Sequence, residues 1–120
     1  MRIKFIGDDD NVLCCSTEGD ITQDAISSAG EMFADTFGDA VYARKVALSL
    51  ADTGFVDSSG VGWLLRCHKR FQESGGALAI HSVQPMVNQV FNMLKLNQVL
   101  LLAKDNNVAR NVLSTDGQAV

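Results

Sequence analysis

The chain of 120 residues lacks any apolar run near the roughly 18 residues that a membrane-spanning helix needs. Its N-terminus, MRIKFIGDDD, lacks the apolar region of a secretory signal, so we expect a cytoplasmic protein without a membrane span. Clusters of Lys and Arg are also missing, and the net charge is -4, which argues against nucleic acid or an anionic membrane surface as a partner. Proteins or small molecules remain as partners.

Cysteine and histidine are scarce, with three and two residues. Cys14 and Cys15 are adjacent in a strand-like run, where successive side chains point to opposite faces, and no CxxC spacing occurs. We therefore predict free thiols packed as small hydrophobes, and neither a metal site nor a cofactor. His68 lies in the middle of an apolar arc and is interpreted as a core or semi-buried residue, the alternative being a base or a ligand.

Nothing in the composition indicates disorder, since 47% of the residues are hydrophobic and 20% are charged. The length suits one domain with one core. We predict a single domain over residues 1–113. The last residues, STDGQAV, are predicted to form a flexible tail over residues 114–120.

The first third of the chain predicts a hairpin and a helix. IKFIG and NVLCCSTEGDI read as two antiparallel strands around the turn-prone GDDDN. Thr22 can then cap a helix that ends at Gly38. The apolar positions of this predicted helix recur every three or four residues: Ala25, Ala29, Met32, Phe33 and Phe37.

The remaining chain alternates between strand and helix patterns. KVALSLADTGF predicts a strand buried on both faces. A helix with Val61, Leu64, Leu65, His68 and Phe71 on one arc follows, and then a strand, a helix from Pro85, the strand VLLLA and a short last helix. This order predicts an α/β fold, with a mixed sheet of four or five strands that is mostly parallel after the hairpin and packed helices.

The segment FVDSSGVGWLL, residues 55–65, stands at the carboxyl end of an internal strand and the amino end of the next helix. Ligands and chemistry collect at this edge of such sheets, and a phosphate on Ser58 or Ser59 would meet helix amides there. Gly60 and Gly62 would let another backbone or a protein surface come close. Alternatively, Asp57 or Ser58 is only an N-cap and the glycines serve only packing.

Three residues of the same predicted helix lie opposite its apolar arc: Trp63, Arg66 and Arg70. An outward tryptophan beside two arginines is typical of a docking patch, because these residue types dominate many interfaces. The alternative is that Trp63 covers a neighbouring helix.

The stretch from ALSLADTGFVDSSGVGWLL to VFNMLKL, with the earlier EGDIT, resembles STAS domains, in particular the anti-sigma factor antagonists. In that family the serine directly after the aspartate is phosphorylated by a partner serine kinase, so the resemblance implies Ser58 as the acceptor. It implies that Asp57 orients the hydroxyl or engages the kinase, that Ser59 caps or supports the site, and that Gly60 and Gly62 are close-approach glycines.

The resemblance implies an anti-sigma factor antagonist, a phosphorylation-controlled interaction module that binds an anti-sigma factor/serine kinase of the GHKL type. Phosphorylation of Ser58 would switch it off, and a serine phosphatase would reverse this. Alternatives are a STAS subunit of a transporter-associated or other signalling complex, or a nucleotide-binding module. No G-x-S-x-G or P-loop is present, so we predict no enzyme. The sequence leaves the oligomeric state open.

Overall fold

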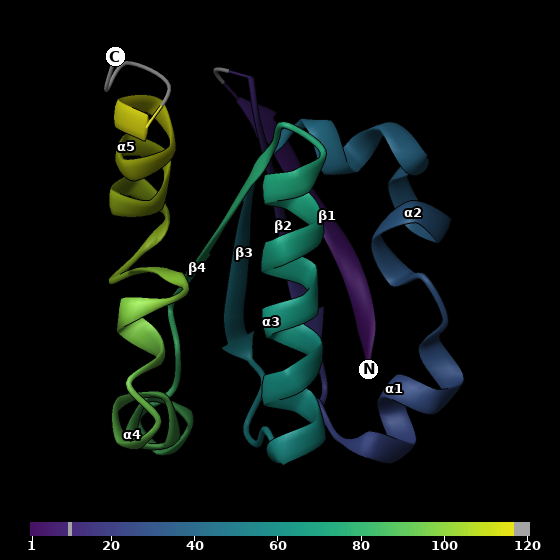
Figure 1. The fold of residues 1–120 in the computed structure, drawn as a ribbon, viewed down its shortest axis with the longest axis vertical. Helices are drawn as coiled ribbons and strands as arrows, with labels where there is room; N and C mark the ends of the chain where they lie inside the picture. Colours follow the sequence, from purple (N-terminus) through teal and green to yellow (C-terminus); the bar gives the residue numbers. More distant parts are fainter. Residues whose placement is uncertain (10, 117–120) are drawn as a thin grey trace.

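A five-stranded sheet with strand order β1-β2-β3-β4-β5 organises the fold. Figure 1 shows it in the computed structural model, which describes residues 1–9 and 11–116. The first two strands pair antiparallel and the others pair parallel, which confirms the predicted hairpin and the mixed α/β fold. The strands are β1 (Arg2–Asp9), β2 (Val12–Glu18), β3 (Lys45–Asp52), β4 (Ala77–His81) and β5 (Leu101–Ala103).

Helices connect the parallel strands and pack against the sheet, with α3 and α5 well separated in Figure 1. None of the described helices is long and apolar enough to cross a membrane. The last helix continues past residue 114, where the predicted tail begins, and residues 117–120 lie outside the described part. The helices are α1 (Gln23–Ala29), α2 (Met32–Phe37), η1 (Asp39–Ala43), α3 (Ser58–Glu73), α4 (Pro85–Met93), η2 (Leu96–Gln98) and α5 (Asn106–Asp116).

The single helix predicted from Thr22 to Gly38 is wrong, because the chain forms two short helices there. Thr22 caps α1 as expected, but Gly30 has φ +63, a left-handed value that ends the helix. Glu31 then pairs with Arg70 of α3 at 2.5 Å. The break leaves Met32 and Phe33 buried, so the apolar periodicity survives although the helix does not.

The two faces of the sheet carry different side chains, because successive strand residues point to opposite sides. Cys14 and Cys15 lie on different faces, and all three cysteines are buried and free, as predicted. The α3 face is built from large residues, including Leu13, Val46, Leu48, Leu50, Leu78 and Ile80. The α5 face contains mainly smaller ones: Val12, Cys14, Ala47, Ala77 and Ala79.

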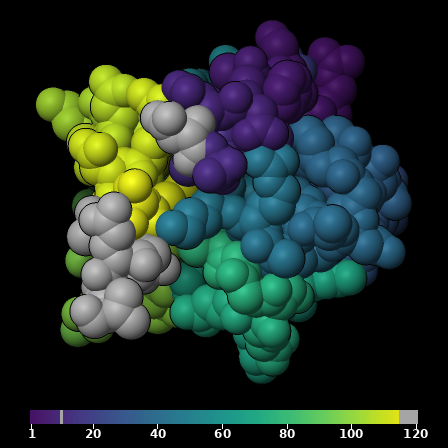
Figure 2. Space-filling model, turned by 90° about the horizontal axis from the view of Figure 1, so that it is seen from above, coloured from purple at the N-terminus to yellow at the C-terminus, as the bar shows by residue number. Residues whose placement is uncertain are grey.

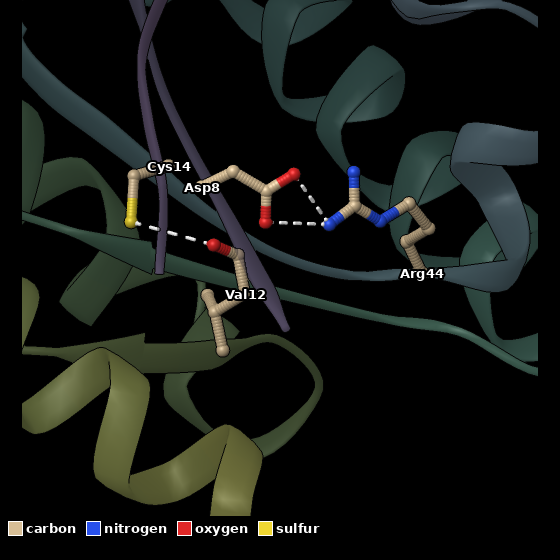
Figure 3. A network of polar contacts seen from close by, with 4 residues as sticks. All are labelled: Asp8, Val12, Cys14 and Arg44. Atoms are coloured by element: carbon tan, nitrogen blue, oxygen red, sulfur yellow. Dashed lines mark hydrogen bonds and ion pairs between the residues drawn. The ribbon is translucent and has the colours of Figure 1, made fainter. Parts of the chain in front are cut away.

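The end of the sheet that carries the β1–β2 turn is tied together by ion pairs. Arg44, just before β3, donates to both carboxylate oxygens of Asp8 at 2.8 and 2.9 Å (Figure 3). Arg110 of α5 pairs with Asp9, and Figure 2 shows the hairpin beside α5 at this end. The segment 55–65 begins at the opposite end, where β3 and β4 finish.

Candidate functional site

The DSSG segment begins α3 at the carboxyl edge of the sheet, as the strand and helix patterns predict. The Ile21 amide donates to the Phe55 carbonyl at 2.9 Å, and the Asp57 amide donates to the Ile21 carbonyl at 3.2 Å. These bonds tie the segment to the link between β2 and α1. Ser58 is the first residue of α3 and is exposed, whereas Ser59 is half-buried. The fold therefore presents the Ser58 side chain to solvent.

Asp57 joins two helix starts with one carboxylate. Its Oδ1 accepts from the Gly60 amide at 2.8 Å and its Oδ2 accepts from the Gln23 amide at 3.0 Å. The first bond makes Asp57 the N-cap of α3, so the predicted capping by this residue is confirmed. The second bond reaches the first residue of α1, a contact that the sequence does not reveal. Asp57 thus fixes the turn that carries Ser58.

Gly60 is buried against the protein's own backbone. A Cβ at this position would overlap the Ile21 carbonyl oxygen and lie 2.8 Å from Cγ1 of Val56. The expected close approach of another backbone at Gly60 is therefore confirmed, but that backbone is the Ile21 segment of this chain, so Gly60 serves internal packing and does not face a partner surface. Gly62, two residues further along α3 and about half a helical turn away, is half-buried and lies on the accessible side.

Two hollows lie along α3, between this helix and the segment formed by α1 and α2. The motif hollow, about 350 Å³, is lined by Gln23, Ile26, Ser27, Ser58, Ser59, Gly62 and Arg66. The aromatic hollow, about 320 Å³, is lined by Ile26, Gly30, Glu31, Met32, Phe33, Tyr42, Trp63, Arg66, Cys67 and Arg70. Ile26 and Arg66 border both, so the two hollows are neighbours. The α1 residues are the part of the site that sequence reasoning missed, although Ile26 is a further apolar residue beside the Ala25–Ala29 stripe.

The prediction that Trp63 points outward is wrong. Only 7% of its surface is exposed, and its ring stacks on Phe33 with centroids 6.1 Å apart and an interplanar angle of 10°. The alternative that it covers a neighbouring helix is confirmed, because α2 packs on that flank of α3. Arg66 and Arg70 are exposed, as expected. Trp63 forms a wall of the aromatic hollow instead of a protruding anchor.

The charged side chains of the aromatic hollow, Arg70 and Glu31 among them, lie at its rim. Arg70 pairs with Glu31 and lies 4.2 Å from the centroid of the Tyr42 ring, while the Tyr42 hydroxyl donates to Glu31 at 3.3 Å. Burial raises the pKa of Tyr42 to about 12, against the opposing effect of Arg70, and burial raises the pKa of Cys67 to about 12. Both groups stay neutral near pH 7, so the hollow combines an apolar floor with charged edges.

His68 is a core residue, as predicted. It is buried, and burial lowers its pKa below the usual value of 6.5. Its Nδ1 atom has no hydrogen-bond partner among the described residues. The imidazole therefore belongs to the interior of the α3 side and stays neutral at pH 7.

Comparison with known proteins places the chain in a family. The model of the STAS domain family matches residues 9–112, and the chain belongs to this family. An anti-sigma F factor antagonist of Paenibacillus polymyxa is 35% identical over 65 residues. That match covers 54% of this chain and 55% of the relative, so it spans about half the length of each.

Solved structures share the fold at low sequence identity. An anti-sigma-factor antagonist (STAS) domain protein of Planctomyces limnophilus is 21% identical, with a TM-score of 0.74 over 95% of this chain and 99% of that one. The murine anion transporter Slc26a9 also gives a TM-score of 0.74, at 11% identity, over 88% of this chain and 18% of the transporter. The STAS fold thus occurs in proteins with different functions, and the fold alone does not decide between them.

Proposed function

We propose that this chain is an anti-sigma factor antagonist controlled by phosphorylation of Ser58. The observation that carries the proposal is the exposed Ser58 side chain on the first residue of α3, fixed by the Asp57 cap beside two hollows with exposed arginines. The sequence similarity to an anti-sigma F factor antagonist supports it. The partner would be an anti-sigma factor that is also a serine kinase of the GHKL type, and a serine phosphatase would remove the phosphate.

The proposed modification is a phosphoryl transfer from ATP. A bond forms between Ser58 Oγ and the γ-phosphorus, and the bond from that phosphorus to the β,γ-bridging oxygen breaks. ADP leaves, and the hydroxyl proton passes to a base of the kinase. The product carries about -1.5 to -2 charges at pH 7, which the amides at the start of a helix favour, so the fold should survive.

The phosphate acts on binding by desolvation. A partner that covers Ser58 and the motif hollow must bury a phosphate of about -1.5 to -2 charges, and burying charge that is not fully paired is costly. We expect phosphorylated protein to bind the anti-sigma factor at least about tenfold more weakly, which corresponds to about 1.4 kcal/mol. The unmodified form is the one that captures the anti-sigma factor and frees the sigma factor.

The experiment has two steps. Partners recovered with unmodified protein and with Ser58→Asp are identified by mass spectrometry, and the recovered kinase is then incubated with ATP and the antagonist. Label on Ser58 that Ser58→Ala abolishes and Ser59→Ala retains is the expected result. Label confined to Ser59, or equal affinity of the two forms for the kinase, would contradict the proposal.

The same pull-down tests the alternative of a transporter-associated subunit. This alternative is tested because the anion transporter Slc26a9 shares the fold. Recovery of a transporter in place of a kinase would favour this second function. Recovery of an anti-sigma factor whose binding is lost in Ser58→Asp would favour the first.

A further inference from the structure

The Arg66 side chain is folded back along α3 towards the two serines. A Cβ added at position 62 would lie 3.3 Å from Nη1 of Arg66, so the guanidinium passes directly over Gly62. This direction follows from helix geometry, in which side chains tilt towards the N-terminus. Arg66 also borders the motif hollow together with Ser58 and Ser59. Its cationic end therefore points to the start of the helix.

Among the described residues that line the motif hollow, Arg66 alone carries a charge. The other described lining residues are uncharged: Gln23, Ile26, Ser27, Ser58, Ser59 and Gly62. The nearest carboxylate in sequence, Asp57, already accepts from two backbone amides. Arg70 differs from Arg66, because it pairs with Glu31 and covers the Tyr42 ring. A new anion at the start of α3 would thus face one cation across the hollow.

We propose that Arg66 is the internal counter-ion of a phosphate on Ser58, and that Gly62 keeps the path between them clear; this inference rests on the proposed function. About one helical turn, about 5.4 Å, separates Gly62 from Ser58. A phosphate extends the serine side chain into that space, and the planar guanidinium can bind two of its oxygens at once. A side chain at position 62 would stand between the two groups.

This pairing gives phosphorylation a second effect on binding. In the unmodified protein Arg66 stands between the motif hollow and the aromatic hollow, where it can meet an acidic group of the partner. A phosphate on Ser58 draws the guanidinium to itself. Phosphorylation therefore adds negative charge and also withdraws a cation from the docking surface. Arg66→Gln should weaken binding of the unmodified form and reduce the ratio between the affinities of the two forms.

The test uses the chain of residues 1–120 with phosphoserine incorporated at position 58 during translation, so that no kinase is needed. A ³¹P NMR titration gives the second pKa of the phosphate. We expect it to be lower by about half a unit with Arg66 than in Arg66→Gln, as for a partly exposed ion pair. Lys69→Gln removes another exposed α3 cation and should leave the pKa as in the parent.

Gly62→Ala tests whether the space between Ser58 and Arg66 must stay open, and it leaves the charge of Arg66 in place. Alanine favours a helix more than glycine does, so the variant should fold, which circular dichroism can confirm. The added methyl should displace the guanidinium and raise the phosphate pKa towards that of Arg66→Gln. An unchanged pKa in Gly62→Ala would overturn the role of Gly62.

Equal phosphate pKa values in the parent and Arg66→Gln would overturn the pairing, as would an equal shift in Lys69→Gln. These outcomes do not depend on the proposed kinase. A normal Arg66 effect in protein that no recovered kinase labels would refute the proposed function alone. Label on Ser58 without an Arg66 effect would refute this inference alone.

Discussion

The two faces of the sheet are packed with side chains of different size. On the α3 face four aromatic rings interlock, with Phe71 5.3 Å from Phe33 and 5.1 Å from Tyr42 between ring centroids. On the α5 face small residues such as Ala79 contact Ala109 and Leu113 of one helix. Small side chains let a helix lie flat on a sheet, whereas bulky ones hold several elements apart. The motif hollow and the aromatic hollow lie on the bulky side, among the elements around α3. A third hollow, of about 390 Å³, lies at α5 and is lined by Val12, Asn107, Arg110, Asn111 and Ser114.

The largest effect that we expect is on the aromatic side, from Trp63→Ala. Removing a buried tryptophan that stacks on Phe33 should lower the free energy of unfolding by about 3–5 kcal/mol. Urea denaturation measures this loss. Met93→Ala is the control, because Met93 is 81% exposed and its removal should change stability by no more than about 0.5 kcal/mol. Normal stability of Trp63→Ala with weakened partner binding would restore Trp63 as a docking residue.

The α5 face should be destabilised by the opposite change, in which a small side chain is replaced by a larger one. Ala79 is fully buried between the sheet and α5, so Ala79→Leu should cost about 1–3 kcal/mol of unfolding free energy. Ile80→Leu in the same strand points to the α3 face, conserves volume and should cost less than about 1.5 kcal/mol. A stabilised Ala79→Leu would show that the α5 face has unfilled space.

The Asp57 cap should contribute less than either core. Asp57→Ala removes the acceptor of two helix-start amides and should cost about 1–2 kcal/mol, within the range measured for helix caps. Asp57→Asn keeps one carbonyl oxygen, so its loss should fall between the parent and Asp57→Ala. Thermal unfolding followed by circular dichroism checks the order. Equal stability of all three proteins would contradict the double cap.

The smallest effect concerns pH and His68. Burial lowers its pKa, so the unfolded chain binds a proton more readily, and the stability from the neutral imidazole is present above the unfolded pKa of about 6.5. It is lost as the pH falls from there towards the lower folded pKa. Urea denaturation at a series of pH values below 6.5 should show a smaller fall in stability for His68→Leu than for the parent. Part of the fall should remain, because burial also lowers the pKa of His81. An unchanged pH profile would show that another group controls this range.

Periodicity predicts the order of elements well, because each strand and helix follows from local alternation and turn residues. The same signal fails at Gly30. Ile26 and Phe33 pack on one core although a left-handed residue interrupts the helix between them, so an apolar period of three to four residues persists across the break. Gly30 is itself a possible stop signal, but only the folded structure shows that the helix ends there, followed by the pairing of Glu31 with Arg70.

Trp63 and Gly60 mark the limit of helical-wheel reasoning at the site. The wheel assumes one buried arc, but α3 is covered on two flanks, so Trp63 is buried although it lies opposite Val61. Gly60 faces the Ile21 carbonyl, a contact between segments about 40 residues apart that spacing along the chain does not encode. Ser58, by contrast, lies at the start of α3 as the sequence predicts, because strand ends and helix starts are local features.

The shared Asp57 carboxylate has a consequence for local opening of the fold. Helix α1 has seven residues and none of them is fully buried, so little packing holds it in place. The bond from the Gln23 amide to Asp57 makes its first turn depend on the N-cap of α3. In hydrogen exchange the amides of Gln23 and Gly60 should lose protection together whenever their hydrogen bonds to the Asp57 carboxylate break. A negative charge added at the adjacent Ser58 should therefore change the frequency with which α1 opens.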